Sequence, residues 1–293
     1  MHSNSKKTLS FNEIIIALEQ FWCQHGCLLM QSYDYPVGAA TSHPATFIKS
    51  LELDEWNCVF MQSCRRPTDG RYGDSPYRLQ HYYQMQVILK PAPKDIQNLY
   101  LNSLHTLGLE VLNNDIRFVE DNWENPSLGA WGIGWEVWFN GMEITQFTYY
   151  QQLGGLTCSP LLVEITYGLE RLAMYIQQKH SVYDILWSVS PSGKEIFYKD
   201  VFLKNEQQQS KYNFEIVNTE LLLATFSALE KEAKATIEQR LNLPAYDLVL
   251  QMSHTFNQLD AAGIISSTER ADYIARIRKL ANNIANNIKQ NDN

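Results

Sequence analysis

The residues best suited to chemistry lie in one arginine-rich segment, residues 64–87, with the sequence CRRPTDGRYGDSPYRLQHYYQMQV. The segment holds a loop rich in glycine and proline between two runs that favour strands, residues 57–64 and 81–89. In the second run the polar Gln84 and Gln86 alternate with apolar residues, which is typical of a hairpin with one dry and one wet face. Arginine offers a planar fork of donors that matches phosphate oxygens and stacks on flat rings. The segment therefore predicts a nucleotide site served by Arg65, Arg66, Arg71 and Arg78.

Two later segments carry residues that suit the same site. Glu136 and Glu143 flank an Asn-Gly pair at residues 140–141, a strong hairpin signal that lets both carboxylates lie on adjacent strands. The segment YGLER, residues 167–171, predicts a strand that enters a helix through glycine, with Arg171 in the first helical turn. Backbone N–H groups at such a junction can approach a polyphosphate. Carboxylates beside arginines suit a nucleotide with Mg²⁺, which bridges carboxylates and phosphates.

Each of these signals also has an ordinary structural interpretation. Arg65 and Arg66 alone would be surface residues at a strand end more often than ligands. Glu136 and Glu143 alone could form structural salt bridges, and tyrosines and tryptophans usually pack in cores. A Gly-Leu-Glu-Arg tetrapeptide is by itself a weak motif, because its glutamate also favours a helix N-terminus. The order of hairpin, carboxylate strands and glycine-to-helix arginine is what favours the functional interpretation.

The elements that position these residues follow from hydrophobic periodicity. The first 204 residues predict an α+β domain, an antiparallel sheet of about six strands flanked by helices. Residues 122–134, rich in Trp and Gly, are expected to form a loop, and residues 205–210 a polar linker. Three amphipathic patterns then predict helices at residues 219–241, 245–262 and 267–289. We therefore expect a domain of residues 1–204 and an all-helical domain of residues 205–293.

Composition limits the classes of protein that this chain can represent. With 293 residues, 45% of them hydrophobic, the chain can bury a full core. A net charge of −8 argues against a surface that binds nucleic acid throughout. No apolar run approaches the length of a membrane span, so we expect no membrane association. Five cysteines without framework spacing predict reduced thiols and a cytoplasmic location.

Taken together, these segments resemble the catalytic domain of class II aminoacyl-tRNA synthetases. They are most similar to the α subunit family of the bacterial heterotetrameric glycyl-tRNA synthetases. The resemblance covers most of residues 10–190 and is more diffuse in residues 248–266. It is carried by SHPATF (42–47), RRPTDGRYG (65–73), RLQHYYQMQVILKP (78–91), DIRFVEDNWENPSLGAWGIGWEVW (115–138), GMEITQFTYYQQLGG (141–155) and EITYGLERLAMY (164–175).

The resemblance implies that ATP and glycine form glycyl-adenylate, from which glycine passes to tRNA(Gly). Arg66 matches the arginine that grips the ATP α-phosphate, although Arg65 beside it leaves the two roles open to exchange. Tyr82 matches the aromatic residue that stacks on adenine, and Arg171 matches the arginine at the far end of the triphosphate. The residues expected to bind ATP are Arg65, Arg66, Arg78, Tyr82, Gln84, Glu136, Glu170 and Arg171, and those expected to be catalytic are Arg66, Arg171 and Glu143.

Glycine offers no side chain to grip, so the site must select by excluding larger amino acids. The wall and the ammonium contacts are expected from Gln84, Gln86, Trp123, Glu143 and Thr145, with core packing as the equal alternative for Trp123. Mg²⁺ is expected at Glu136 and Glu143.

The resemblance also implies a homodimer of this chain within an α2β2 tetramer. A larger β subunit would supply most of the tRNA binding, which accounts for the acidic charge of this chain. The C-terminal helices are then expected to support β docking and dimer formation. Two alternatives remain: a free-standing enzyme that adenylates a small amino acid, and an inactive scaffold subunit. Loss of the glycine-pocket residues would favour the first and loss of the motif arginines the second, and the residues are present.

Overall fold

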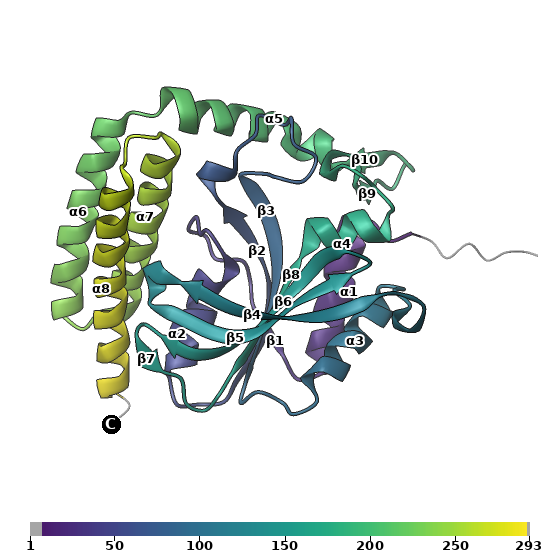
Figure 1. Cartoon of the computed structure of the whole chain (residues 1–293), viewed down its shortest axis with the longest axis horizontal. Coiled ribbons are helices and arrows are strands. Elements are labelled where there is room, and N and C mark those ends of the chain that lie inside the picture. Colours follow the sequence, from purple (N-terminus) through teal and green to yellow (C-terminus); the bar gives the residue numbers. More distant parts are fainter. Residues whose placement is uncertain (1–7, 292–293) are drawn as a thin grey trace, which may run out of the picture.

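The arginine-rich hairpin belongs to the main sheet of the computed structural model, which describes residues 8–291. β2 (Trp56–Arg65) and β3 (His81–Lys90) pair antiparallel along their whole lengths, as predicted. They belong to an eight-stranded sheet with the order β1-β2-β3-β8-β6-β5-β4, on which β7 pairs with β6 (Figure 1). All pairs are antiparallel except β1 with β2. The remaining strands are β1 (Leu28–Leu29), β4 (Ile116–Asn125), β5 (Ala130–Phe139), β6 (Met142–Leu153), β7 (Leu156–Thr157) and β8 (Val163–Gly168).

Helices cover the sheet on two sides. α1 (Phe11–Gln24), α3 (Ile96–Thr106) and α4 (Leu169–Ile176) share one hydrophobic core with the sheet. A second core joins the opposite face to α2 (Pro44–Leu51) and to the C-terminal helices, which stand beside the sheet in Figure 1. The predicted antiparallel sheet flanked by helices is therefore confirmed. A small hairpin of β9 (Leu186–Val189) and β10 (Glu195–Phe197) leads into α5 (Tyr198–Lys211), which crosses from the sheet to the C-terminal helices.

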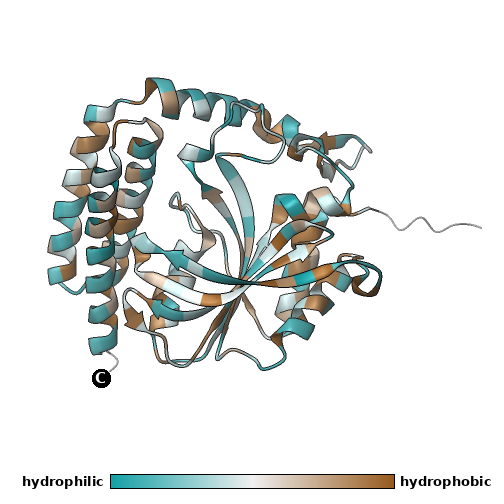
Figure 2. Ribbon diagram, viewed as in Figure 1, coloured by the Kyte–Doolittle hydropathy of each residue, from teal (hydrophilic) through white to brown (hydrophobic). Residues whose placement is uncertain are grey.

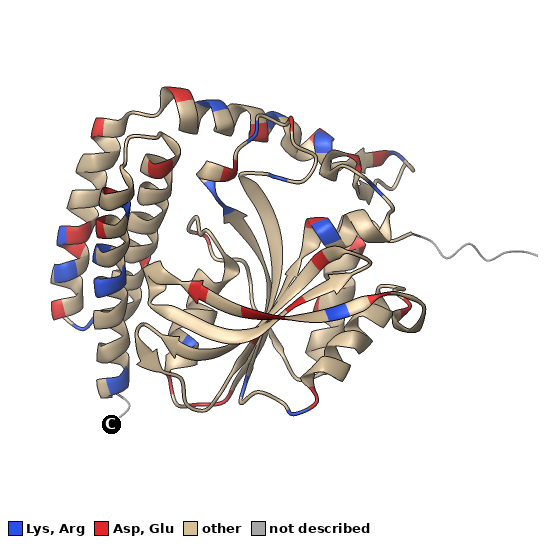
Figure 3. Ribbon diagram, in the orientation of Figure 1, with Lys and Arg blue, Asp and Glu red and all other residues tan. Residues whose placement is uncertain are grey.

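Three long helices form the C-terminal part, close to the predicted bounds: α6 (Thr219–Glu238), α7 (Asn242–Ala261) and α8 (Ser267–Asn291). Figure 2 shows hydrophilic and hydrophobic residues alternating along them, and Figure 3 shows both charge signs interspersed there. The bundle is fastened to the sheet domain by Tyr246, whose ring stacks on Phe47 at 4.7 Å and whose hydroxyl donates to the Ser42 carbonyl at 2.9 Å. Among residues 8–291, none of the helices is long and apolar enough to cross a membrane.

One turn and one glycine within a strand show why the sequence folds locally as it does. The predicted Asn140–Gly141 turn joins β5 to β6, and both residues have positive φ, 48° and 84°. Further along β5, a Cβ atom on Gly134 would lie 2.1 Å from the Phe147 carbonyl oxygen. Glycine at this position therefore allows the backbones of β5 and β6 to approach closely.

Two local predictions were wrong. Residues 122–134 form no loop, because β4 continues to Asn125 and β5 begins at Ala130 after a turn at Pro126–Leu128. β4 contains many polar residues, which do not favour a strand in the sequence. It nevertheless pairs with β5 over ten positions, because it lies at the edge of the sheet, where charged side chains can reach solvent. Residues 205–210 form no linker, since they lie inside α5. The short helix α2, which the sequence patterns did not predict, begins at Pro44 behind a His43 side-chain cap.

Candidate active site

One face of the sheet collects the polar side chains predicted for the site. Residues that pair across antiparallel strands project to the same face. The register pairs Gln86 with Thr166, Thr166 with Gln146, and Gln146 with Glu136. Four strands, β3, β8, β6 and β5, thus present a continuous row of polar groups on the face opposite to α1, α3 and α4.

A cavity of about 600 Å³ opens on this face. It brings together eight predicted residues: Arg66, Arg78, Tyr82, Gln84, Glu143, Thr145, Glu170 and Arg171. Gly168, the glycine of the predicted strand-to-helix junction, also lines it, and six residues not predicted for the site complete the lining: Asp69, Tyr77, Leu79, Ile144, Gln146 and Thr166. Five predicted residues do not line it: Arg65, Arg71, Gln86, Trp123 and Glu136. We call this space the sheet cavity.

Arg66 is held at the end of β2 by two contacts. Its Nε donates to the Gly38 carbonyl oxygen at 2.8 Å, and its guanidinium lies 5.2 Å from the centre of the Tyr82 ring. The Tyr82 hydroxyl donates to the same Gly38 oxygen at 2.8 Å. One N–H group of Arg66 thus orients the side chain. Because the side chain is exposed, its other N–H groups can donate to a ligand. The Tyr82 ring, expected to stack on adenine, here supports an arginine.

Strand alternation separates Arg65 from Arg66. Arg65 pairs with His81, whose ring lies against Tyr83 and against Phe202 of α5. Burial and, second, the Arg65 charge lower the pKa of His81 to about 4. Arg66 lines the sheet cavity and Arg65 does not. Of the two arginines, Arg66 is therefore the one placed to meet a ligand there.

Arg171 and Glu143 form an ion pair in the sheet cavity. Arg171 Nη1 lies 2.6 Å from Glu143 Oε2 and also donates to the Glu143 carbonyl oxygen at 3.3 Å. Gly168 caps the helix that carries Arg171, as predicted. The arginine side chain is 53% exposed, so a phosphate can reach it without a change of backbone. Glu136 instead accepts the Trp138 indole N–H at 2.9 Å, outside the cavity lining.

Glu170 has its carboxylate turned into the protein. One oxygen accepts the Tyr83 N–H at 2.8 Å and the Tyr198 hydroxyl at 3.0 Å. Burial raises the pKa of Glu170 to about 7, against the opposing effect of these hydrogen bonds. Although Glu170 reaches the cavity lining, these contacts make it an anchor between α4 and β3.

A buried carboxylate that sequence reasoning missed lies behind the sheet cavity. Glu164 is 2% exposed and accepts the Tyr150 hydroxyl at 2.6 Å and the Thr41 hydroxyl at 3.1 Å. Thr166, which lines the cavity, lies 3.3 Å from Glu164 and donates to Gln86 at 2.8 Å. Burial raises the pKa of Glu164 to about 7, and the hydrogen bonds oppose that rise. A glutamate inside the apolar run of β8 was the available sequence signal.

Trp123 lies on β4 and not in a loop. Its ring meets Tyr150 edge to face with 5.4 Å between ring centroids, and the side chain packs against the second core. Since Tyr150 donates to Glu164, Trp123 supports the group of residues around the buried carboxylate while staying outside the sheet-cavity lining.

A second missed residue, Glu206, holds the arginine-rich loop from α5. Its carboxylate accepts the N–H groups of Arg71 and Gln80, each at 2.9 Å, and it is 2% exposed. The Ser210 hydroxyl donates to Glu206 at 3.3 Å and accepts the Tyr72 N–H at 3.0 Å. Two backbone donors, one near the middle of the loop and one at its end, thus share one buried carboxylate. Glu206 positions the loop that carries Arg78 without lining the cavity.

Metal binding needs more oxygen ligands than the protein gathers by itself. Among residues 8–291, no group of three His, Cys, Asp or Glu side chains could hold a metal ion. Mg²⁺ often binds through one or two carboxylates and substrate phosphates. Glu143, in the sheet cavity, suits that arrangement, whereas Glu136 lies outside the lining.

Solved structures of aminoacyl-tRNA synthetases resemble this fold. A pyrrolysyl-tRNA synthetase of Desulfitobacterium hafniense, PylSc, matches with a TM-score of 0.44 and 12% identity over 64% of this chain and 74% of that chain. A second structure of the pyrrolysyl-tRNA synthetase from this organism matches with a TM-score of 0.43 and 13% identity over 64% of this chain and 76% of that one.

The sequence itself assigns the family. The sequence model of the glycyl-tRNA synthetase alpha subunit matches residues 11–293, and the chain belongs to that family, as the motifs predicted. It is therefore a subunit of a tRNA ligase, and an alpha subunit implies a beta subunit as its partner.

Proposed function

We propose that the sheet cavity is the adenylation site of glycyl-tRNA synthetase. A carboxylate oxygen of glycine attacks the α-phosphorus of ATP, the bond from that phosphorus to the bridging oxygen breaks, and pyrophosphate leaves. The resulting glycyl-adenylate then passes glycine to tRNA(Gly). The observation that supports this most is that Arg66, from the end of β2, and Arg171, from the start of α4, line one cavity.

The reaction needs positioning and charge stabilisation and no nucleophilic side chain. Arg66 binds the α-phosphate and stabilises the charge that grows on its oxygens during attack. Arg171 and Arg78 bind the outer phosphates, and Glu143 orients Arg171 through the 2.6 Å ion pair. Glu143 would also hold the Mg²⁺ ion, which neutralises phosphate charge when it is bound.

Glycine binds at the end of the sheet cavity nearest Thr166, with its ammonium group directed to Glu164. A buried carboxylate is stabilised by a cation more strongly than an exposed one, because little water competes. Gln84 and Thr145, which line the cavity, and Gln86, hydrogen-bonded to Thr166, complete the surroundings. Trp123 lies outside this lining, so any limit that it sets on larger amino acids acts through Tyr150, against which it packs. An alanine-activating Trp123→Ala enzyme would support that wall, and one that still ignores alanine would contradict it.

The tRNA is bound largely by the β subunit, in a cytoplasmic α2β2 enzyme built on a dimer of this chain. The acidic charge of −8 fits a subunit that contributes the chemistry more than the nucleic-acid surface. The C-terminal helices α6–α8 are proposed to support β docking. If a folded chain truncated after residue 217, just before α6, binds β as the full chain does, that docking proposal is wrong.

ATP–pyrophosphate exchange with each of the twenty amino acids tests the proposed function. The purified chain is assayed with and without its β partner. Exchange with glycine alone, in either sample, is the expected result. No exchange in both samples, from folded protein, would instead favour an inactive scaffold subunit. Exchange without any transfer to tRNA by the full complex would favour the free-standing adenylating enzyme.

A further inference from the structure

One short turn connects the sheet cavity to the C-terminal helices. It is a single turn of 3₁₀-helix, Ala40–Ser42, between β1 and α2, and we call it the Thr41 turn. The Ala40 N–H donates to Gln84 Oε1 at 2.9 Å. The Thr41 hydroxyl donates to the Glu164 carboxylate and lies 3.1 Å from each of its oxygens. The turn therefore contacts two of the strands that form the cavity, β3 and β8.

α7 holds the Thr41 turn from the C-terminal domain. The hydroxyl of Tyr246, a fully buried residue, donates to the Ser42 carbonyl oxygen at 2.9 Å. The Tyr246 ring stacks on Phe47 of α2 with an interplanar angle of 5°, which fixes the direction of the hydroxyl. The next residue of α7, Asp247, accepts the hydroxyl of Tyr33, which precedes the turn in the chain. Two consecutive residues of α7 thus fasten the segment that contains the turn.

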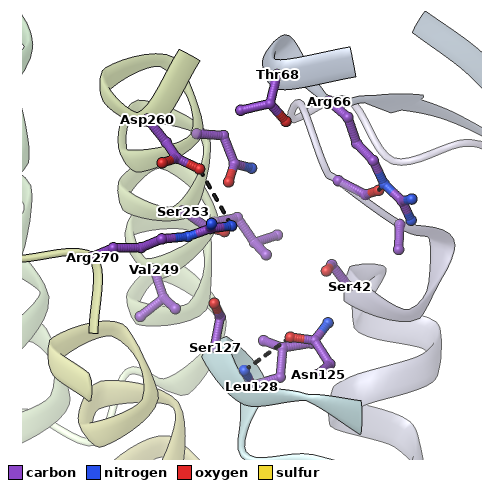
Figure 4. Close-up of a pocket in the computed structure, with 14 residues that line it drawn as sticks. Ser42, Arg66, Thr68, Asn125, Ser127, Leu128, Val249, Ser253, Asp260 and Arg270 are labelled. Atoms are coloured by element: carbon purple, nitrogen blue, oxygen red, sulfur yellow. Dashed lines mark hydrogen bonds and ion pairs between the residues drawn. The ribbon is translucent and has the colours of Figure 1, made fainter. Parts of the chain in front are cut away.

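The Thr41 turn is not packed against α7 along its whole length. A cavity of about 260 Å³ lies beyond the Tyr246 contact, with Ser42 on one side and Val249 and Ser253 of α7 on the other (Figure 4). Ala39, at the start of the turn, provides no side-chain cap, and hydrogen bonds in a 3₁₀-helix have poorer geometry than those in an α-helix. The turn therefore has room to shift when the hydrogen bond from Tyr246 is lost.

We propose that Tyr246 is a positioning residue for glycine, because it holds the turn from which Thr41 donates to Glu164. The proposal rests on the proposed function, in which Glu164 attracts the glycine ammonium group. The hydroxyls of Thr41, Tyr150 and Thr166 stabilise the carboxylate form of Glu164. If the turn shifts, the buried carboxylate loses one of these donors and its charged form becomes less stable. A residue of α7 that does not line the sheet cavity thus sets the affinity for the amino acid.

Tyr246→Phe in the full αβ complex tests the proposal, because it removes the hydroxyl and keeps the ring on Phe47. In ATP–pyrophosphate exchange at pH 7, KM for glycine is expected to rise about fivefold, the effect of weakening a hydrogen bond to a charged group. The values of kcat and of KM for ATP should stay within about twofold. Tyr273→Phe is the matched control on α8, where the described part of the chain offers the hydroxyl no hydrogen-bond partner, and should change none of these values.

The pH dependence of KM for glycine gives a second readout. In the described part of the chain, the groups that hydrogen-bond to Glu164 are Thr41, Tyr150, Thr166 and Gln86. Of these only Tyr150 titrates, and burial raises its pKa well above the ordinary value of 10, so a step near pH 7 reports Glu164. In Tyr246→Phe this step should move upward by about half a unit, because the carboxylate has lost a donor.

A double-mutant cycle separates positioning from a general loosening of the fold. Thr41→Val removes the hydroxyl with little change of shape and should itself raise KM for glycine. If Tyr246 acts through Thr41, adding Tyr246→Phe to Thr41→Val should raise KM little further, whereas independent effects would multiply. Multiplied effects would overturn the proposal, as would an unchanged KM and pH step in Tyr246→Phe.

A further variant decides if Tyr246→Phe does not fold. Asp247→Asn weakens the other contact of α7 with this segment, the one with Tyr33. A raised KM for glycine in folded Asp247→Asn supports the proposal, and an unchanged KM rejects it. Absence of glycine-dependent exchange in the unmodified complex would instead reject the adenylation function itself.

Discussion

The two ends of the sheet cavity are built in different ways. At the end proposed for the phosphates, Arg66 and Arg171 are exposed and are held by neighbours within the sheet domain. At the end proposed for glycine, Glu164 is buried and accepts from Thr41, in a turn that α7 contacts from the C-terminal domain. Displacement at phosphorus requires donors that a triphosphate can reach, whereas glycine binding requires a charge that the surrounding residues hold in place. The account therefore assigns one substrate to each end.

Removing Arg66 should have the largest effect, because it is proposed to bind the phosphate at which the new bond forms. Arg66→Ala is expected to lower glycine-dependent exchange on the order of 10²–10³-fold, the usual loss when a transition-state donor is removed. The fold should persist, since the side chain is exposed. Arg65→Ala is the matched control, on the opposite face of the same strand, and should lose far less. A larger loss in Arg65→Ala, measured by pyrophosphate exchange, would reverse the two assignments.

Arg171 is proposed to bind the outer phosphates, so its loss should separate adenylate formation from the later transfer to tRNA. Arg171→Ala is expected to reduce exchange by about 10²-fold, while transfer from glycyl-adenylate supplied in advance stays near normal, because pyrophosphate has already left. Arg117→Ala removes another exposed arginine, paired with Asp115 at 2.8 Å, and should leave exchange unchanged. Near-normal exchange in Arg171→Ala would remove this arginine from the adenylation site.

Glycine binding should depend on pH through Glu164. Only the carboxylate attracts an ammonium group, so KM for glycine should fall as pH rises through about 7, the pKa of Glu164. Glu164→Gln should raise KM and remove the pH dependence. Glu170→Gln is the control, because burial raises the pKa of Glu170 to about 7 as well, away from the proposed ammonium. If the pH step vanishes in Glu170→Gln and survives in Glu164→Gln, the ammonium site is wrong.

The raised pKa of Glu164 also predicts the direction in which the free energy of unfolding changes with pH. Its pKa is higher in the folded chain than the ordinary value of 4.5, so the folded state holds more protons between about pH 4.5 and 7. The contribution of this group to the free energy of unfolding is therefore full below that range and is lost as pH rises through it. Chemical unfolding across this range should show a shallower loss of stability in Glu164→Gln than in the unmodified chain. An identical pH profile would contradict the raised pKa.

Weakening the contacts that hold the arginine-rich loop should have a moderate effect on ATP binding in the sheet cavity. In Glu206→Gln, only one side-chain oxygen remains to accept the Arg71 and Gln80 N–H groups. We expect KM for ATP to rise several-fold, with a smaller change in kcat and a loss of stability of about 1–3 kcal/mol. Glu232→Gln, at an exposed position of α6, is the control. Unchanged KM with lowered stability would make Glu206 structural only.

Local sequence signals were sufficient for the elements that carry the arginines. Three short patterns each predicted the local structure to within a few residues. They are the alternation around Gln84, the Asn140–Gly141 pair, and the glycine that precedes the helix of Arg171. The roles of Arg65 and Arg66 separated only once the register of β2 with β3 assigned their faces. Glu206 could not be predicted, because it lies more than 120 residues from the N–H groups that it accepts. The loop predicted at residues 122–134 overlapped the end of β4, because pairing with β5 at the sheet edge outweighs the low strand preference of the acidic residues in β4.

The structure of the chain with a non-hydrolysable glycyl-adenylate analogue tests the central claim most directly. The account predicts that the group replacing the α-phosphate contacts Arg66 and that the ammonium group faces Glu164, both in the sheet cavity. An analogue bound with its phosphate mimic away from Arg66, or with its ammonium group away from Glu164, would contradict the account.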